Sequence, residues 1–315
     1  MILPDSGYGF NTRRRRPGSR RKLILILTAI VVAVAVLFIW QRKQIIELFS
    51  GKKEVQLTLQ ELWEAQNYEE INLRCEQQLL ETPLDRRALV YNGFSFFYRA
   101  VSQYSLEEKI PFFDEAIKNL RKALLFDTNE LGARISYVLG KAYHFKGRYY
   151  TDLTIYYLDK SIELGYIGDD TYEYLGLAHS EIGDYESSVV YFQNAVEQSP
   201  NDIRYLVLSQ AYLNLGDSDR AEEFLIRALN KTQDSQIARK CRFLLGKIYF
   251  EKNELTKAED EYKKILEISP KSADAHYYLG EIYQEYGKTI EARAEWRKAE
   301  QLDPNHYGAR LRLYG

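Results

Sequence analysis

The segment from Ala273 to Asn305 constrains the fold more than any other part of the sequence. On both sides of Gly287 its apolar and small residues recur at the i, i+3, i+4, i+7 spacing of one helix face. Those residues are His276, Leu279, Gly280, Tyr283, Ala292, Trp296 and Ala299. Pro304 ends the second helix, because proline lacks the N–H that the helix needs. Two short amphipathic helices joined by a glycine turn cannot bury their apolar faces alone, so the segment requires neighbours of the same kind.

One such neighbour lies immediately upstream. Five marker positions of the segment recur 34 residues earlier in the chain. Gly246, Tyr249, Ala258, Tyr262 and Pro270 precede, in that order, Gly280, Tyr283, Ala292, Trp296 and Pro304. A helix pair that returns at a fixed period is typical of a stacked array.

These markers resemble the tetratricopeptide repeat (TPR), in which an aromatic residue, Leu-Gly and Tyr are followed by Ala, an aromatic residue, Ala and Pro. The resemblance implies an all-α TPR solenoid, a right-handed superhelix of helix-turn-helix repeats. Less regular copies extend it to about seven repeats over residues 52–306. The expected repeats are 52–85, 86–132, 133–168, 169–201, 202–238, 239–272 and 273–306. Residues 307–315 begin a further first helix and are predicted to form a partial C-terminal cap.

The second repeat departs most from the period. It carries extra residues between its helices, from about Val101 to Phe113. Within this insertion, the sequence Ser105-Leu106-Glu107-Glu108 predicts a capping box at a helix start. Whether the insertion has a function of its own is left open by the sequence.

A membrane anchor is predicted near the N-terminus. Leu23 to Trp40 contains no charged residue, and its only polar residue is Thr28. As a helix, such a run rises about 27 Å, close to the roughly 30 Å thickness of the hydrocarbon layer. A cleaved secretory signal or a twin-arginine signal is the alternative, but no small-residue cleavage site follows the run. The expected organisation is a basic cytoplasmic tail (1–22), a single transmembrane helix (23–40) and a juxtamembrane linker (41–51).

The charges around this helix predict its orientation. Seven Lys and Arg residues precede it, in the segments Arg13 to Arg16 and Arg20 to Lys22. Positive flanks stay in the cytoplasm, where anionic lipid headgroups attract them. The repeat style and the uncleaved anchor look bacterial, so we expect a single-pass inner-membrane protein with its TPR domain in the periplasm. A eukaryotic signal-anchored protein, with Asn230 as a glycosylation sequon, is the alternative.

Composition separates the basic tail from the repeats. Residues 1–43 hold nine basic residues and one acidic residue, so the 34 basic and 44 acidic residues of 44–315 give a net charge of −10. Phosphate would be repelled by that region, which argues against a nucleic-acid partner. The two cysteines, Cys75 and Cys241, lie in distant repeats, and a disulfide would need Cα atoms within about 7 Å of each other.

The sequence gives little support to catalysis. It has no G-x-x-x-x-G-K-[ST] phosphate loop. Gly93-Phe94-Ser95 begins like a nucleophile elbow, but Phe97 stands where the second glycine is needed. The four histidines lack companions at zinc-ligand spacing. We therefore expect no enzyme activity, no cofactor, no metal site and no small-molecule substrate.

The TPR resemblance implies that positions 2, 5, 9, 12 and 13 of each repeat line a concave groove that binds a protein or peptide. Some aromatic residues at these positions could instead pack between repeats. The predicted groove residues are Arg134, Tyr137, Lys141, His144, Phe145, Glu173, Glu181, Leu206, Gln210, Asn214, Lys240, Phe243, Lys247, Phe250, Tyr277 and Glu281.

Together these features predict a membrane-anchored scaffold or adaptor that recruits proteins to a bacterial envelope complex. Aromatic anchors among mixed charges suit a protein partner. A non-catalytic regulatory subunit of a membrane-associated enzyme is the alternative. The sequence names neither the partner nor the oligomeric state.

Overall fold

The computed structural model describes residue 42 and residues 57–126 and 130–315. The predicted cytoplasmic tail, transmembrane helix and linker lie outside these residues, except for Arg42. In the part of the chain that is described, no helix is both long and apolar enough to cross a membrane. By its contacts the chain divides into residues 1–61 and residues 62–315.

Helix α2 (Leu59–Glu64) begins in the first unit, and its last residues, Leu62 to Glu64, belong to the second. A reciprocal pair of hydrogen bonds caps this helix. The backbone N–H of Glu61 donates to Thr58 Oγ1 at 3.2 Å, and the N–H of Thr58 donates to Glu61 Oε2 at 2.6 Å.

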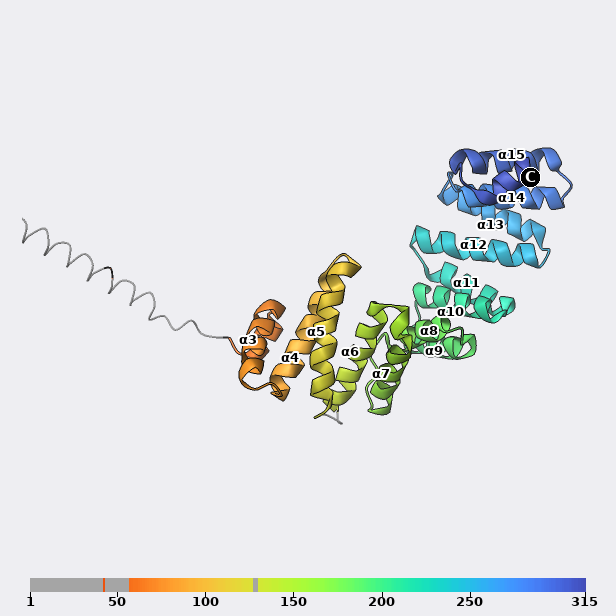
Figure 1. Cartoon of the computed structure of the whole chain (residues 1–315). Coiled ribbons are helices and arrows are strands. Elements are labelled where there is room, and N and C mark those ends of the chain that lie inside the picture. Colours follow the sequence, from red (N-terminus) through yellow and green to blue (C-terminus); the bar gives the residue numbers. More distant parts are fainter. Residues whose placement is uncertain (1–41, 43–56, 127–129) are drawn as a thin grey trace, which may run out of the picture. The chain divides into compact units, whose positions relative to one another are not determined.

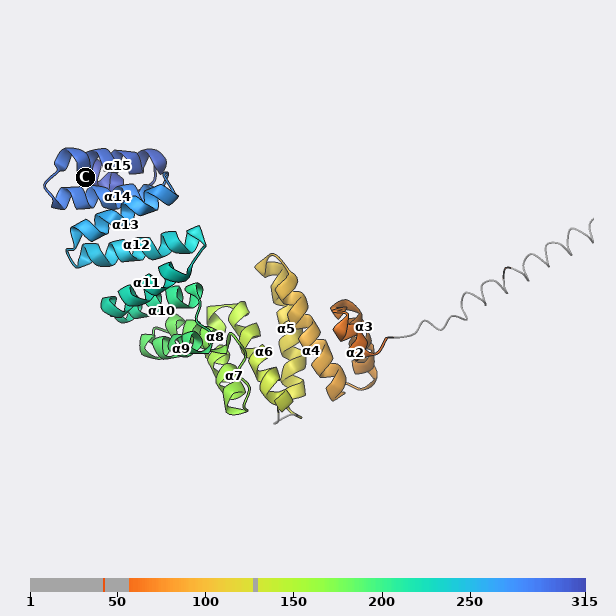
Figure 2. The ribbon, with the colours of Figure 1, turned by 180° about the vertical axis from the view of Figure 1, so that it is seen from behind.

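The second unit is a succession of paired helices that pack in chain order, as Figures 1 and 2 show. No strand occurs among the described residues, and the predicted all-α solenoid is confirmed. The elements are α3 (Tyr68–Glu81), α4 (Arg86–Ser102), α5 (Leu106–Leu124), α6 (Glu130–Lys146), the 3-10 turn η1 (Arg148–Tyr150), α7 (Thr151–Glu163), α8 (Thr171–Glu181), α9 (Tyr185–Gln198), α10 (Asp202–Leu215), α11 (Ser218–Lys231), α12 (Ser235–Glu251), α13 (Leu255–Ile268), α14 (Ala273–Glu285), α15 (Thr289–Leu302) and α16 (Tyr307–Tyr314).

The first helices of two repeats start ahead of the expected boundaries. Helix α6 begins at Glu130 and α12 at Ser235, whereas the repeats were expected from residues 133 and 239. Between α14 and α15 the glycine turn is present, and Gly287 adopts a left-handed φ of 74°. Glycine suits this position, because residues that carry a Cβ rarely adopt a positive φ.

The extra residues of the second repeat lengthen its helices and do not form a long connection, which corrects the expectation of an insertion between them. Helix α4 has 17 residues and α5 has 19, and only residues 103–105 separate them. The capping box is confirmed, since the N–H of Glu108 donates to Ser105 Oγ at 3.2 Å and the N–H of Ser105 donates to Glu108 Oε2 at 3.4 Å. Pro111 lies inside α5, in its second turn.

In five of the helix pairs, from α4/α5 to α14/α15 but not in α10/α11, a large side chain of the second helix lies directly against a glycine of the first. A Cβ added to Gly140 would lie 2.6 Å from Leu158 Cγ, and one added to Gly246 would lie 2.8 Å from the Tyr262 ring. At Gly280 the nearest atoms, in the indole of Trp296, would be 2.4 Å away. Glycine at this position therefore sets how closely the two helices approach.

Polar side chains tie successive repeats together. Arg204 of α10, only 9% exposed, donates through Nε to Glu173 of α8 at 2.5 Å. Nη1 donates to the backbone carbonyls of Ala195 and Ser199 at 3.2 and 2.8 Å, and Nη2 donates to that of Asp169 at 2.7 Å. A buried guanidinium needs acceptors such as these four, because an unpaired buried charge is strongly destabilising.

A second buried polar group lies where α3 meets α4. Asn72 Nδ2 donates to Asn92 Oδ1 at 2.7 Å and to the Asn92 carbonyl at 3.1 Å. Arg99 Nη1 donates to Asn72 Oδ1 at 2.9 Å. Both cysteines, Cys75 in α3 and Cys241 in α12, are buried and free.

Candidate functional site

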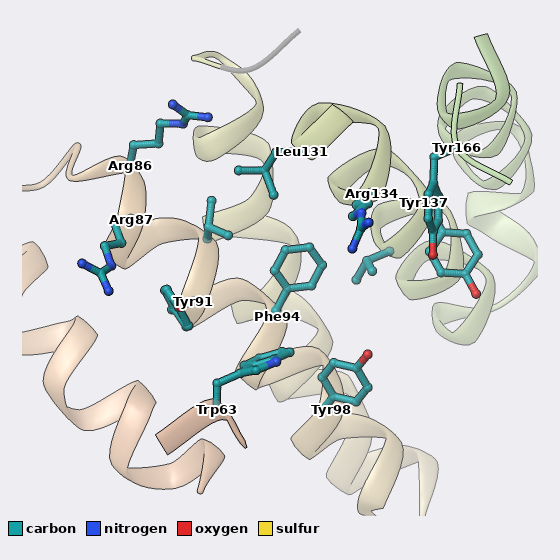
Figure 3. A pocket seen from close by; sticks show the side chains of 12 residues that line it. Trp63, Arg86, Arg87, Tyr91, Phe94, Tyr98, Leu131, Arg134, Tyr137 and Tyr166 are labelled. Carbon is teal, nitrogen blue, oxygen red and sulfur yellow. The ribbon is translucent and has the colours of Figure 1, made fainter. Parts of the chain in front are cut away.

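A groove of about 690 Å³ runs along the first helices of repeats one to three (Figure 3). We call it the aromatic groove. Helices α2, α4 and α6 supply most of its walls, and the segment before α8 supplies Tyr166. The lining residues are Trp63, Arg86, Arg87, Val90, Tyr91, Phe94, Tyr98, Leu131, Arg134, Tyr137, Val138 and Tyr166.

Trp63, at the end of the short helix α2, organises one wall of the groove. Its ring meets Tyr91, Phe94 and Tyr98 edge-to-face, with centroid distances of 6.1, 6.3 and 5.6 Å. Tyr68 meets the same indole at 5.4 Å and stacks on Tyr98 at 5.3 Å. Edge-to-face packing suits the quadrupoles of these rings. Because Trp63, Tyr91 and Phe94 are only half-buried, the wall keeps apolar area open to a ligand.

Tyr137 and Tyr166 form the opposite wall, with ring centroids 5.3 Å apart. The Tyr137 hydroxyl donates to the Asp170 carboxylate. Lys141 Nζ donates to Asp170 Oδ2 at 2.7 Å and to the Tyr137 oxygen at 3.1 Å. Burial first, and then the bond to Asp170, raise the pKa of Tyr137 above its usual range. The phenol therefore stays neutral and its ring is held in place, while both Asp170 oxygens are already in use.

A glycine permits the close approach that fixes this wall. The Tyr137 ring lies against Gly168, where a Cβ would come within 2.6 Å of the ring. The backbone N–H of Gly168 donates to Thr171 Oγ1 at 2.8 Å, which fixes the start of α8. The wall is thus positioned by backbone as well as by side chains.

The charged residues of the groove are all of one sign. Its lining includes Arg86, Arg87 and Arg134 and no carboxylate. The Arg87 guanidinium lies 5.8 Å from the Tyr91 ring centroid, and that of Arg134 lies 5.4 Å from the Tyr166 centroid. In Figure 3 the Arg134 side chain lies between the two aromatic walls. The groove therefore combines apolar rings with cationic donors.

Two of the sixteen predicted residues, Arg134 and Tyr137, line this groove. Lys141 is not part of the lining, but it binds Asp170, the carboxylate that holds the Tyr137 hydroxyl. Their neighbours on α6 have a different environment: His144 meets the Tyr174 ring edge-on at 4.8 Å, and Phe145 stacks on Phe113 at 5.4 Å. Burial lowers the pKa of His144. These two rings pack between repeats.

The predicted residues of the fourth and fifth repeats do not line the groove. Glu173 is bound by Arg204, and Glu181 accepts from Thr151 Oγ1 at 2.8 Å. Leu206 belongs to the core, Gln210 is half-buried and Asn214 is exposed.

In the sixth and seventh repeats, most of the predicted rings contact other rings. Phe243 lies edge-on to Tyr262 at 6.0 Å and to Tyr278 at 5.5 Å, and Phe250 packs against the same core. Tyr277 lies 4.9 Å from the His306 ring. Three charged residues complete the set: Lys240 is exposed, Lys247 is half-buried, and Glu281 accepts from Arg312 at 2.9 and 2.6 Å.

The prediction missed most of the groove, although one signal for it was present in the sequence. Arg87, Val90, Phe94 and Tyr98 occupy positions 2, 5, 9 and 13 of the second repeat, counted from residue 86. The prediction applied these positions only from the third repeat onward. For Trp63 the signal is weak, because the first repeat lacks the Leu-Gly marker.

The histidines have structural partners. His179 Nδ1 lies 2.9 Å from Asp184 Oδ2, and His276 Nδ1 lies 2.6 Å from Glu295 Oε2. His306 Nδ1 accepts the N–H of Ala309 at 3.1 Å. Among the described residues, no three His, Cys, Asp or Glu side chains are grouped so as to hold a metal ion.

Comparison with known proteins identifies the repeats. The family described as tetratricopeptide repeat matches residues 181–242 and 273–306, and the description TPR repeat matches residues 246–287. No curated protein sequence matches the chain. The predicted TPR repeats are therefore confirmed, and the described helices form a TPR solenoid.

Solved structures agree on the fold. The C-terminal part of a TPR repeat-containing protein from Cytophaga hutchinsonii matches 82% of this chain and 98% of its own, with a TM-score of 0.63 and 15% identity. YrrB, described as a TPR protein with an unusual peptide-binding site, matches 62% of this chain and 98% of its own, with a TM-score of 0.50 and 19% identity.

Proposed function

We propose that this protein is a membrane-anchored scaffold that binds a protein partner through the aromatic groove. One observation carries the proposal: half-buried rings from α2, α4 and α6 line one 690 Å³ cavity and leave apolar area exposed. A peptide segment buries such rings, and a buried aromatic anchor at an interface commonly contributes about 2 kcal/mol or more. TPR folds serve as protein-interaction scaffolds, and a peptide-binding site is named for the similar protein YrrB.

Photo-crosslinking tests this site in the full-length chain. A crosslinking amino acid at Tyr91 or Tyr98 is expected to trap one discrete protein. The same group at Lys118, an exposed α5 residue outside the groove, is expected to trap little. Equal trapping from both faces would contradict the proposal.

A binding variant then separates recognition from folding. Phe94→Ala is expected to weaken partner binding about thirtyfold, the equivalent of about 2 kcal/mol, with the helical circular-dichroism signal unchanged. Phe250→Ala is the matched control, because that ring packs against the core of the C-terminal repeats and lies outside the groove. If both variants weaken binding equally, the effect is a general loss of structure and the groove is not the site.

The membrane anchor belongs to the same proposal. Leu23 to Trp40 is the spanning helix, and the seven preceding basic residues keep the N-terminus in the cytoplasm. The TPR domain then lies in the periplasm of a bacterium, where it organises an envelope complex. Alkaline phosphatase fused after Gly315 is expected to be active. If the fused phosphatase is inactive and a cytoplasmic reporter fused at the same point is active, the orientation is the opposite of the one proposed.

A further inference from the structure

We infer that the partner segment of the aromatic groove is acidic, with Asp and Glu residues on either side of one aromatic or aliphatic anchor. This inference rests on the proposed function, since it names the chemistry of the ligand of the same groove. Three observations support it: the charge of the groove lining, the way its arginines are held, and the apolar area between them.

The charge of the lining contrasts with that of the repeats. The groove has three arginines and no carboxylate, whereas residues 44–315 carry a net charge of −10. Asp170, beside the Tyr137 wall, already accepts hydrogen bonds from the Tyr137 hydroxyl and from Lys141. An acidic segment is therefore repelled by most of the domain and attracted to this groove, which favours binding at one place.

The arginines are placed to accept a new carboxylate. The Arg87 guanidinium carbon lies over the Tyr91 ring, 5.8 Å from its centroid. A cation–π contact uses none of the five N–H donors, so they can still form bidentate bonds to a carboxylate. Arg134 pairs with Glu130 at 3.0 Å, but the two side chains are 56% and 81% exposed. A pair so exposed is weak. A ligand carboxylate that enters the groove can replace Glu130 without a large loss.

The apolar part of the groove sets the anchor. Trp63, Phe94 and Tyr98 face the cavity from one side, and Tyr137 and Tyr166 face it from the other. A volume of about 690 Å³ is within the range of small-ligand pockets. It accommodates one large side chain with the flanking backbone, while the arginines at the edges reach the neighbouring carboxylates.

Charge also argues against the chain's own N-terminal tail as the occupant. The segment from Arg13 to Lys22 is strongly basic, so it would be repelled by the same arginines. A second copy of the acidic repeat domain is a different occupant, and it is distinguished below by its effect on oligomeric state.

Selection from random peptides tests the inference on the full-length chain in lipid nanodiscs. Phage-displayed random dodecapeptides are the probe. The expected result is enrichment of sequences rich in Asp and Glu around one Phe, Tyr, Trp or Leu. A synthetic peptide of the winning sequence is expected to lose about tenfold in affinity for the double variant Arg87→Gln, Arg134→Gln. Both arginines are exposed, so their replacement leaves the fold intact.

The control matches the change in charge. Lys118→Gln with Lys122→Gln removes two positive charges from α5, outside the groove, and is expected to change affinity less than twofold. Raising salt from 50 to 300 mM is expected to weaken binding to the wild type and to the control. It should affect the arginine variant much less.

The outcomes separate the inference from the proposed function. If the selected peptides are neutral or basic and still require Phe94, the groove binds peptides but the acidic inference is overturned. If binding of the selected peptides is unchanged by Phe94→Ala, the groove is not the site and both fail. If the chain is a dimer by sedimentation, and Phe94→Ala makes it a monomer, then a second copy is the occupant and the acidic-peptide inference is overturned.

Discussion

Trp296 packs on Gly280, so a substitution at Gly280 tests this contact by whether it raises or lowers the free energy of unfolding. We consider the substitution Gly280→Ala in the middle of α14. At a helix position with free space, alanine is expected to stabilise by about 1 kcal/mol, because glycine has the larger unfolded-state entropy. Here the new Cβ would lie 2.4 Å from the indole of Trp296.

The surroundings determine whether the indole can move away. Trp296 is 4% exposed and packs with Ala292, Ala299 and Ala309, which are fully buried. Overpacking of this kind costs about 1–3 kcal/mol, and a rigid ring held by such neighbours is at the upper end. After subtraction of the helix-propensity gain, we expect Gly280→Ala to lower the free energy of unfolding by about 2 kcal/mol.

A double-mutant cycle assigns this loss to the ring. The fifth repeat has Ser209 at the position of Gly280, and sixteen residues later it has Leu225 where the seventh has Trp296. The fifth repeat thus combines a side chain at the glycine position with leucine, smaller than tryptophan, at the later position. The variant Gly280→Ala, Trp296→Leu is expected to be more stable than the sum of the single effects predicts, by at least about 1 kcal/mol.

The assay has to resolve single repeats, because the stability of a solenoid is a sum of local and neighbour terms. Hydrogen exchange of the α14 and α15 amides, together with guanidinium unfolding, provides that resolution. The expected loss is concentrated in these two helices and in α16. A more stable Gly280→Ala protein, or additive effects in the cycle, would refute the claim that the indole sets the helix spacing.

Three further predictions concern buried groups. Burial raises the pKa of the Cys75 thiol to about 12 and that of Cys241 to about 11. The neutral thiols should therefore resist alkylation at pH 8 unless urea unfolds the protein. Keeping both thiols neutral contributes stability that is fully present below their ordinary pKa of 9.0. Chemical denaturation at a series of pH values should show the free energy of unfolding falling as pH rises from 9 to about 12. Asn72→Leu leaves Asn92 without its partner and should cost about 1–3 kcal/mol, seen as faster hydrogen exchange in α3 and α4. Arg204→Met should destabilise by about 3–5 kcal/mol, measured by guanidinium unfolding, because three backbone carbonyls and a carboxylate lose a buried donor.

The regular part of the fold could be predicted from the sequence because its markers have direct physical causes. Gly280 is needed where an indole meets backbone, and Gly287 is needed where φ is positive. A period built on such positions identifies helix pairs without any knowledge of distant contacts. The same period does not say how extra residues are used. In the second repeat they extend α4 and α5 and leave the connection short.

The candidate site was harder to predict, because a residue's position in the repeat does not reveal how much of its side chain neighbouring residues cover. Tyr137 and Phe243 occupy position 5 of their repeats. In the structure Tyr137 borders an open cavity, whereas Phe243 packs on Tyr262 and Tyr278. The difference depends on the rings that the second helix of the same repeat and the first helix of the next repeat present, so it needs the three-dimensional arrangement.

The same argument explains why the groove forms at the irregular end of the array. In the sixth repeat the first-helix ring of Phe243 is covered by rings of the next two helices, Tyr262 at 6.0 Å and Tyr278 at 5.5 Å. Repeat one offers only the six-residue helix α2, which covers the neighbouring rings in part and contributes Trp63. Rings that a full helix would have buried thus remain half-exposed along α4. A solenoid that recognises a partner through aromatic side chains has to leave some of them uncovered, and a short helix beside a long one achieves this while the rest of the array stays tightly packed.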